Sequence, residues 1–156
     1  MSPKKKVYTL VFLRKENEVL LGMKKRGFGV GKWNGFGGKI EAGETIAEGA
    51  AREVEEECGL TVQTEDLDKT AVIEFEFKGD PVKLEVHVFQ TRTFGGDIIE
   101  SEEMRPEWFS EKAVPFETMW VDASCWYHHM FQSKKFTAYF LLDGYDKILQ
   151  ERIEFL

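Results

Sequence analysis

Three glutamates, Glu53, Glu56 and Glu57, stand three and four residues apart within GKIEAGETIAEGAAREVEEECGL, residues 38–60. On a helix this spacing projects their carboxylates from one face. Three like charges on one surface repel one another, and a divalent cation removes that conflict. Magnesium prefers such hard oxygen ligands, completed by water and substrate phosphates. The alternative is a solvated acidic helix face, because charge runs usually indicate only exposure.

A glycine-rich loop and a helix are expected to position these carboxylates. Thr45 with Glu48 three residues later forms a capping box, and Gly59 stands where a helix commonly ends. Glycines before the helix predict a loop that turns sharply and lets its backbone approach a ligand closely. They are Gly35, Gly37, Gly38 and Gly43.

The same stretch matches the signature of the Nudix hydrolases at each specified position. That signature is a glycine, five residues, Glu44, seven residues, Arg52, Glu53, an aliphatic residue, one free position, Glu56, Glu57, one free position, Gly59 and an aliphatic residue. The chain therefore resembles enzymes that cleave nucleoside diphosphates linked to another moiety, using magnesium or manganese and a water nucleophile. Metals neutralise phosphate oxygens and acidify a bound water, which suits this chemistry.

The resemblance also assigns roles. It implies that Arg52 orients a glutamate by a charge-assisted hydrogen bond and that Glu44 ties the loop to the helix. One of the three helix glutamates is the candidate general base. The implied metal-binding set is Gly37, Glu53, Glu56, Glu57 and Glu103.

Blocks outside the signature resemble a narrower group, the animal oxidised purine nucleoside triphosphatases, which are counterparts of MutT. The blocks are YTL (8–10), LLGMKKRGFGVGKWNGFGGK (20–39), SEEMRPEWF (101–109), PFETMW (115–120) and KKFTAYF (134–140). This resemblance extends from about Tyr8 to about Leu149. It implies hydrolysis of modified purine nucleoside triphosphates, such as 8-oxo-dGTP, 2-oxo-dATP, O6-methyl-dGTP or N6-methyl-dATP, to monophosphate and pyrophosphate.

The resemblance places a modified base in a pocket floored by sheet residues and closed by aromatic side chains. Asn34 is expected to hydrogen-bond the base edge, Phe28 and Trp120 to pack on the ring, and Lys24 to meet the sugar or phosphates. The implied walls are Thr9, Leu10, Phe75, Phe77, Leu84 and Met104, with Phe36, Gly37, Gly38 and Lys39 contributed by the loop. For Phe75, Phe77 and Leu84, simple core packing is an equal alternative.

One position departs from the family pattern. The family carries two consecutive aspartates after the pocket tryptophan, whereas this chain has Asp122 followed by Ala123. Asp122 can accept hydrogen bonds from a purine, or donate one if burial raises its pKa. The methyl group of Ala123 neither donates nor accepts a hydrogen bond. A base oxygen facing position 123 must therefore bind water or remain without a partner, at a free-energy cost of about 1 to 3 kcal/mol if it is buried. We therefore expect a preference among modified purines that differs from the family pattern.

The expected fold class is α/β (α+β), an α/β/α sandwich with a mixed β-sheet and a loop-helix-loop catalytic motif, in a single Nudix domain at 1–156. Alternating apolar residues predict strands at 8–13, 19–23, 72–78 and 82–91. A second helix is expected at 123–132. Residues 147–155 have helical spacing, but the resemblance implies a final strand, which we adopt. None of the three histidines is assigned a catalytic role.

The composition limits the kinds of molecule that this protein is expected to bind. A net charge of −7 disfavours a general nucleic-acid binder, while Lys24, Lys25, Arg26 and Lys32 form a local positive entrance for a triphosphate. No apolar run has the length of a membrane span, and the N-terminus lacks a signal-peptide core, so we expect a cytoplasmic protein serving the cellular nucleotide pools. Two cysteines are expected to be reduced thiols. The resemblance implies a monomer.

Two rival interpretations remain. The nearer is a Nudix enzyme that acts on another pyrophosphate, such as a dinucleotide, an ADP-sugar or a capped RNA end. A base-recognition set of Asn34, Trp120 and Asp122 disfavours it. The farther is a non-catalytic nucleotide-binding Nudix module, which usually loses signature glutamates; this chain keeps all of them.

Overall fold

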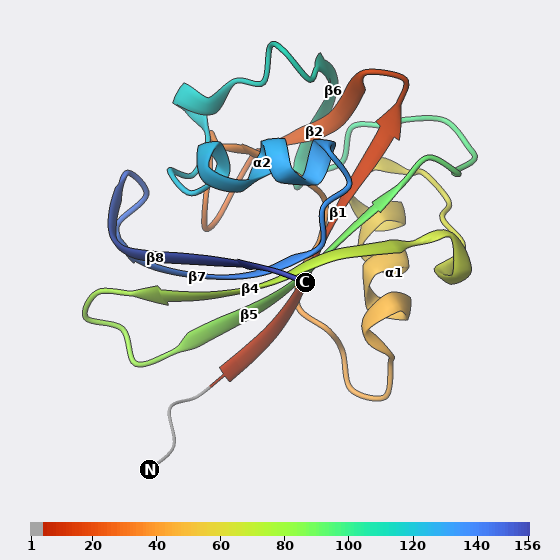
Figure 1. Cartoon of the computed structure of the whole chain (residues 1–156). Helices are drawn as coiled ribbons and strands as arrows, with labels where there is room; N and C mark the ends of the chain where they lie inside the picture. The colour runs from red at the N-terminus through yellow and green to blue at the C-terminus, as the bar shows by residue number, and fades with distance from the viewer. Residues whose placement is uncertain (1–4) are drawn as a thin grey trace.

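A mixed eight-stranded sheet forms the centre of the computed structural model, which describes residues 5–156 (Figure 1). Residues 1–4 of the expected domain lie outside the described residues. The elements are β1 (Lys5–Lys15), β2 (Glu18–Lys24), β3 (Trp33–Asn34), α1 (Ile46–Cys58), η1 (Thr64–Asp66), β4 (Asp68–Phe77), β5 (Lys83–Thr91), β6 (Met104–Ser110), η2 (Phe116–Thr118), α2 (Ala123–Phe131), β7 (Phe136–Asp143) and β8 (Lys147–Phe155).

The strand order is β3-β2-β1-β5-β4-β7-β8, and β6 pairs with β2 beside this path. The pairs β1–β5 and β4–β7 are parallel, whereas the other named pairs are antiparallel. Parallel neighbours require crossover connections, and the chain between β1 and β5 includes α1. The predicted mixed sheet is confirmed.

The two faces of the sheet carry separate hydrophobic cores because successive side chains of a strand point to opposite sides. Val11 and Leu13 of β1 pack with Val54 of α1, whereas Phe12 packs with Trp126 of α2. Figure 1 shows α1 and α2 on opposite sides of the sheet. The prediction of helices on both faces is confirmed.

Helix α1 has the predicted ends. The Thr45 side chain accepts from the backbone N–H of Glu48, and the Glu48 carboxylate accepts from the N–H of Thr45. Gly59 ends the helix with φ 81°, in the left-handed region that favours glycine. Both signals that the sequence contained are therefore present in the structure.

The predicted strands correspond to β1, β2, β4 and β5, and the predicted second helix to α2. The tail at 147–155 is strand β8, so the resemblance was a better guide there than helical spacing. Three strands were not foreseen as such, and the shortest of them is β3, with two residues. The other two are β6, whose Pro106 weakens a strand prediction, and β7. Cys58 and Cys125 are free thiols, as expected. Among the described residues, no helix is long and apolar enough to cross a membrane.

Candidate active site

The glycine loop before α1 lies against strand β1, and two of its glycines have no room for a side chain. The backbone N–H of Thr9 donates to the carbonyl of Gly38 at 2.9 Å. A Cβ at Gly37 would overlap the Thr9 carbonyl oxygen, and one at Gly38 would lie 2.7 Å from the Glu53 carboxyl carbon. The loop backbone therefore reaches both the sheet and the acidic helix, as the glycine pattern predicted.

Arg52 is the centre of the charged network on α1. Its guanidinium binds both oxygens of Glu44, with Nε to Oε2 at 3.0 Å and Nη2 to Oε1 at 2.7 Å. It also donates to Glu53 at 3.0 Å, to Glu56 at 3.2 Å and to the carbonyl of Lys39 at 3.2 Å. The side-chain hydrogen bond from Arg52 lowers the pKa of Glu44 to about 2, helped by the backbone N–H of Glu41. Glu44 thus joins the loop to the helix through Arg52.

Glu57 lies on the inner side of α1 and is only 5% exposed. The backbone N–H of Gly37 donates to its Oε1 at 2.9 Å. Burial raises the pKa of Glu57 to about 8, and the nearby charge of Glu53 adds to the effect. Burial also raises the pKa of Glu53, although Arg52 opposes the shift. The acidic end of the site therefore disfavours full ionisation of its carboxylates unless a positive charge lies nearby.

Glu103 faces the positive residues of the loop after β2. Lys24 Nζ donates to Glu103 Oε2 at 3.0 Å, and Arg26 Nε donates to Oε1 at 2.8 Å. These hydrogen bonds, from Lys24 first, lower the pKa of Glu103. Lys25 in turn pairs with Glu100 at 2.6 Å. Three cations of the predicted positive entrance are thus already paired with carboxylates.

Over residues 5–156, no three His, Cys, Asp or Glu side chains gather closely enough to hold a metal ion. Glu53 and Glu56 turn toward Arg52, and Glu103 turns toward Lys24 and Arg26. The chemistry of the donor set nevertheless fits a hard cation, because buried carboxylates with raised pKa values gain most from a nearby positive charge.

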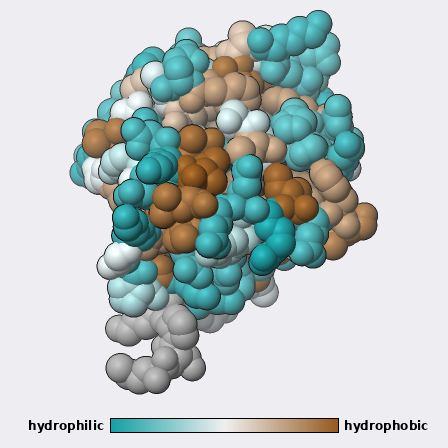
Figure 2. Space-filling model, turned by 60° about the vertical axis from the view of Figure 1, so that its left-hand side comes forward, coloured by the Kyte–Doolittle hydropathy of each residue, from teal (hydrophilic) through white to brown (hydrophobic). Residues whose placement is uncertain are grey.

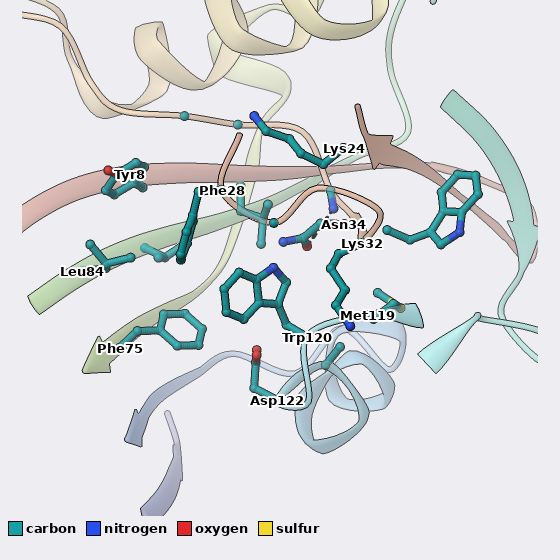
Figure 3. A pocket seen from close by; sticks show the side chains of 18 of the residues that line it. Tyr8, Lys24, Phe28, Lys32, Asn34, Phe75, Leu84, Met119, Trp120 and Asp122 are labelled. Carbon is teal, nitrogen blue, oxygen red and sulfur yellow. Dashed lines mark hydrogen bonds between the residues drawn. The ribbon is translucent and has the colours of Figure 1, made fainter. Parts of the chain in front are cut away.

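A cavity of about 330 Å³ extends from Glu57 to the start of α2 (Figure 3). The predicted residues that it brings together are Thr9, Leu10, Lys24, Phe28, Asn34, Gly37, Gly38, Phe75, Phe77, Leu84, Met104, Trp120 and Asp122. Of the predicted catalytic and metal-binding side chains only Glu57 lines it, and two of the predicted substrate-binding residues do not. Phe36 is fully buried in the core beneath α1, and Lys39 contributes its carbonyl to Arg52.

Asn34 presents its amide nitrogen as the free end of its side chain. Its Oδ1 accepts from the backbone N–H of Gly35 at 2.9 Å and from the hydroxyl of Tyr127 at 3.1 Å. Both partners use the oxygen, so the two N–H groups of the amide remain available for a ligand. Tyr127 is a site residue that sequence reasoning missed, because nothing local links it to a strand 93 positions away.

Asp122 lies at the first turn of α2 and is almost completely buried. The indole Nε1–H of Trp126 donates to its Oδ2 at 2.8 Å. Burial raises the pKa of Asp122 to about 6, although the Trp126 hydrogen bond opposes the shift. The four-residue spacing of Asp122 and Trp126 on a helix could have predicted this pair. Ala123 is buried next to Asp122 and lines the cavity.

An aromatic cluster closes the mouth of the cavity. The ring of Trp120 lies 5.0 Å from Phe28, 5.9 Å from Phe77 and 4.6 Å from Tyr145, measured between centroids. Phe28 is 65% exposed. In Figure 3 the side chains of Trp120 and Asn34 point into the same space. Of this cluster, sequence reasoning missed only Tyr145.

Similarity to known proteins decides the family. The profile of the NUDIX domain matches residues 4–130, which is most of the chain. The chain belongs to the Nudix family. Like other Nudix proteins, it carries the acidic helix directly after a glycine loop, here α1 after residues 35–43.

Two relatives of this Nudix chain carry the same name. It is 48% identical to the oxidized purine nucleoside triphosphate hydrolase of Danio rerio over 149 residues, covering 96% of this chain and 94% of the relative. It is 50% identical to the Mus musculus protein of the same name over 144 residues, covering 92% and 91%.

Solved structures support the fold. The crystal structure of a MutT protein from Bacillus halodurans superposes with a TM-score of 0.81 at 25% identity, covering 96% of this chain and 97% of that one. The expected Nudix fold is therefore confirmed.

Proposed function

We propose that this Nudix hydrolase converts oxidised or otherwise modified purine nucleoside triphosphates to the monophosphate and pyrophosphate, and so sanitises the nucleotide pool. One cavity is lined by the polar pair Asn34 and Asp122 and also by the acidic residue Glu57, and this observation carries the proposal. A purine nucleotide has the matching layout, with a hydrogen-bonding ring at one end and charged phosphates at the other. The zebrafish and mouse relatives are named for the same activity.

Magnesium is the proposed cofactor, with manganese as a substitute. The residues that would hold it are Gly37, Glu53, Glu56, Glu57 and Glu103. When bound, the ion neutralises phosphate charge and makes a coordinated water acidic enough to form hydroxide near neutral pH. Arg52 positions Glu53 and Glu56 from the solvent side, and the Gly37 N–H positions Glu57 from the sheet side. One of the three helix glutamates acts as the general base.

The base is proposed to lie between the aromatic cluster and the polar pair of Asn34 and Asp122. The amide of Asn34 donates to a base acceptor, because its oxygen is already engaged. Asp122 accepts a hydrogen bond when ionised and donates one when protonated, and its raised pKa makes both forms accessible between pH 5 and 7. Stacking on an aromatic ring adds about 1 to 3 kcal/mol per base.

Ala123 is proposed to shift the preference among modified purines. Its methyl group lines the cavity beside Asp122 and offers no hydrogen bond. The comparison is the ranking of kcat/KM over 8-oxo-dGTP, 2-oxo-dATP, O6-methyl-dGTP and N6-methyl-dATP for the native chain and an Ala123→Asp variant. A changed ranking supports the proposed role of position 123, and an identical ranking refutes that role.

The proposal also includes one Nudix domain spanning residues 1–156, acting as a cytoplasmic monomer on a small-molecule nucleotide rather than on nucleic acid. Strands β7 and β8 follow residue 130 and pair within the same sheet, which supports the single domain.

The experiment that tests this function is a substrate panel in magnesium. It contains the four modified purine triphosphates, dGTP, dATP, a dinucleoside polyphosphate, ADP-ribose and a capped RNA. Selective release of pyrophosphate from a modified purine triphosphate supports the proposal. Selective cleavage of the other compounds supports a different Nudix substrate, and nucleotide-dependent thermal stabilisation without turnover supports a non-catalytic module.

A further inference from the structure

Tyr145 occupies the turn between β7 and β8 and lies outside the lining of the cavity, yet it contacts three residues that line it. Its ring centroid is 4.6 Å from that of Trp120 and 6.2 Å from that of Phe28. The ammonium of Lys32 lies 5.7 Å from the same centroid, within the range of a cation–π contact. One side chain thus touches both segments that form the mouth, the segment of Phe28 and Lys32 and the segment of Trp120.

The Phe28 segment of the mouth needs such a partner because it has little packing of its own. Phe28 is 65% exposed, and Gly27 and Gly29 on either side of it adopt positive φ values of 77° and 87°. A segment with few buried contacts opens at low free-energy cost. On the face shown in Figure 2, apolar side chains gather near the centre within a polar surround.

The backbone of the turn is attached to the other side of the mouth. The N–H of Val121 donates to the carbonyl of Tyr145 at 3.0 Å. Val121 stands between Trp120 and Asp122, the ring and the carboxylate that face the proposed base. The turn therefore supports Trp120 in two ways, through the Tyr145 ring and through this hydrogen bond.

We propose that Tyr145 is a positioning residue for base recognition, which holds Trp120 in the orientation that stacks on a purine ring. This inference rests on the proposed function. Tyr145 has no contact with α1 or with Glu57, so it acts on nucleotide affinity and leaves the hydrolytic step unchanged. Within residues 5–156 the Tyr145 hydroxyl has no hydrogen-bond partner, so the ring carries the effect.

The kinetic test compares Tyr145→Ala and Tyr145→Phe with the native chain on the best modified purine triphosphate. We expect Tyr145→Ala to raise KM about three- to tenfold, the range that one aromatic contact contributes. Its kcat stays within about twofold because the acidic helix is untouched. Tyr145→Phe restores the native KM. A native KM in Tyr145→Ala, or an equal loss in Tyr145→Phe, overturns the proposal.

Phe155→Ala is the matched control. Phe155 is 53% exposed, against 42% for Tyr145, and lies at the far end of β8, where it packs on His129 at 4.8 Å. Its removal takes a similar aromatic side chain from the same strand pair without touching the mouth. We expect native KM and kcat for this variant. A rise in KM equal to that of Tyr145→Ala would show a general loss of fold stability and overturn the proposal.

A nucleotide-free measurement separates this inference from the proposed function. Acrylamide quenching of tryptophan fluorescence is compared between the native protein and Tyr145→Ala. The same comparison is then made between Trp120→Phe and the double variant that carries both Trp120→Phe and Tyr145→Ala. Easier quenching in the first comparison alone shows that Tyr145 shields Trp120; no difference overturns the inference. Easier quenching in a protein that hydrolyses no modified purine would refute the proposed function and leave the positioning role standing.

Discussion

Glu57 is the residue in which burial and charge conflict most strongly. It is held by one backbone N–H, it lies near Glu53, and its pKa is raised to about 8. A protein gains stability when such a carboxylate becomes neutral and gains function when a cation is bound beside it. A cation bound beside Glu57 would therefore offset the stability that the buried carboxylate costs.

Glu57→Gln is predicted to separate these two effects. Glutamine keeps an oxygen for the Gly37 N–H and removes the charge, so in metal-free buffer at pH 7 the variant should be about 1 to 3 kcal/mol more stable. Hydrolysis in magnesium should fall about 10²- to 10⁴-fold. Urea unfolding and pyrophosphate release measure the two quantities. Glu55→Gln, on the same helix, should change neither; a Glu57→Gln variant with native turnover would refute the assigned role.

Asp122 is predicted to give the free energy of unfolding a distinctive pH dependence. Its folded pKa of about 6 lies above the ordinary 3.8, so between these values the folded state binds more protons than the unfolded one. The contribution of Asp122 to the free energy of unfolding is complete below about pH 4. It falls by about 1 to 3 kcal/mol as the pH rises to 6. Asp122→Asn should lack that loss in denaturation series from pH 4 to 7, whereas Asp97→Asn should retain it. An identical profile for Asp122→Asn contradicts the burial argument.

At the scale of elements, the site depends on how α1 begins and ends. The capping box starts the helix, Gly59 ends it, and Ile99, from the loop between β5 and β6, packs over the glycine. A Cβ at Gly59 would lie 2.6 Å from Ile99 Cγ1 and 3.0 Å from the carbonyl oxygen of Asp97. The end of the acidic helix α1 is thus fixed by both backbone conformation and packing.

Gly59→Ala is predicted to lower the free energy of unfolding by about 2 to 4 kcal/mol, from the strain of a positive φ and the clash with Ile99. Gly43→Ala is the control, because Gly43 has φ 84° and no atom within 4 Å of an added Cβ. It should lose only about 1 to 2 kcal/mol. Chemical denaturation of both variants measures the difference. Equal losses would mean that packing over Gly59 contributes nothing.

The sequence predicted those elements whose ends and faces depend on residues close together in the chain. The capping box of Thr45, the glycine cap at Gly59 and the alternation in β4 and β5 act within a few residues, and the structure contains all of them. The hydrogen bond from Tyr127 to Asn34 and the contact of Tyr145 with Trp120 join residues far apart in the chain. No local pattern encodes them, so they become visible only in the folded structure.

At the scale of the whole molecule, Arg14 connects four parts of the fold. It is 2% exposed and donates to Gln90 of β5 at 2.7 Å, to the carbonyl of Glu18 at the start of β2 at 3.2 Å, and to Glu111. Its guanidinium also lies 4.6 Å from the ring centroid of Phe131 at the end of α2. None of these partners lines the cavity, so the network serves the fold.

Arg14→Met is predicted to destabilise the protein by about 2 to 4 kcal/mol, because buried acceptors lose their donor while Glu111 regains water. KM and kcat should stay within about twofold at a temperature where the variant is folded. Thermal unfolding and steady-state kinetics provide the two readings. Arg92→Met, which removes an exposed guanidinium, should leave stability nearly native; a large change in KM for Arg14→Met would contradict a purely structural role.

The most direct test of the central claim is pyrophosphate release from 8-oxo-dGTP and from dGTP by the native chain in magnesium, with Glu57→Gln measured in parallel. The account predicts a kcat/KM for the modified nucleotide at least tenfold above that for dGTP, equivalent to about 1.4 kcal/mol of discrimination, and loss of both activities in the variant. Equal turnover of the two nucleotides, or turnover that survives Glu57→Gln, would contradict it.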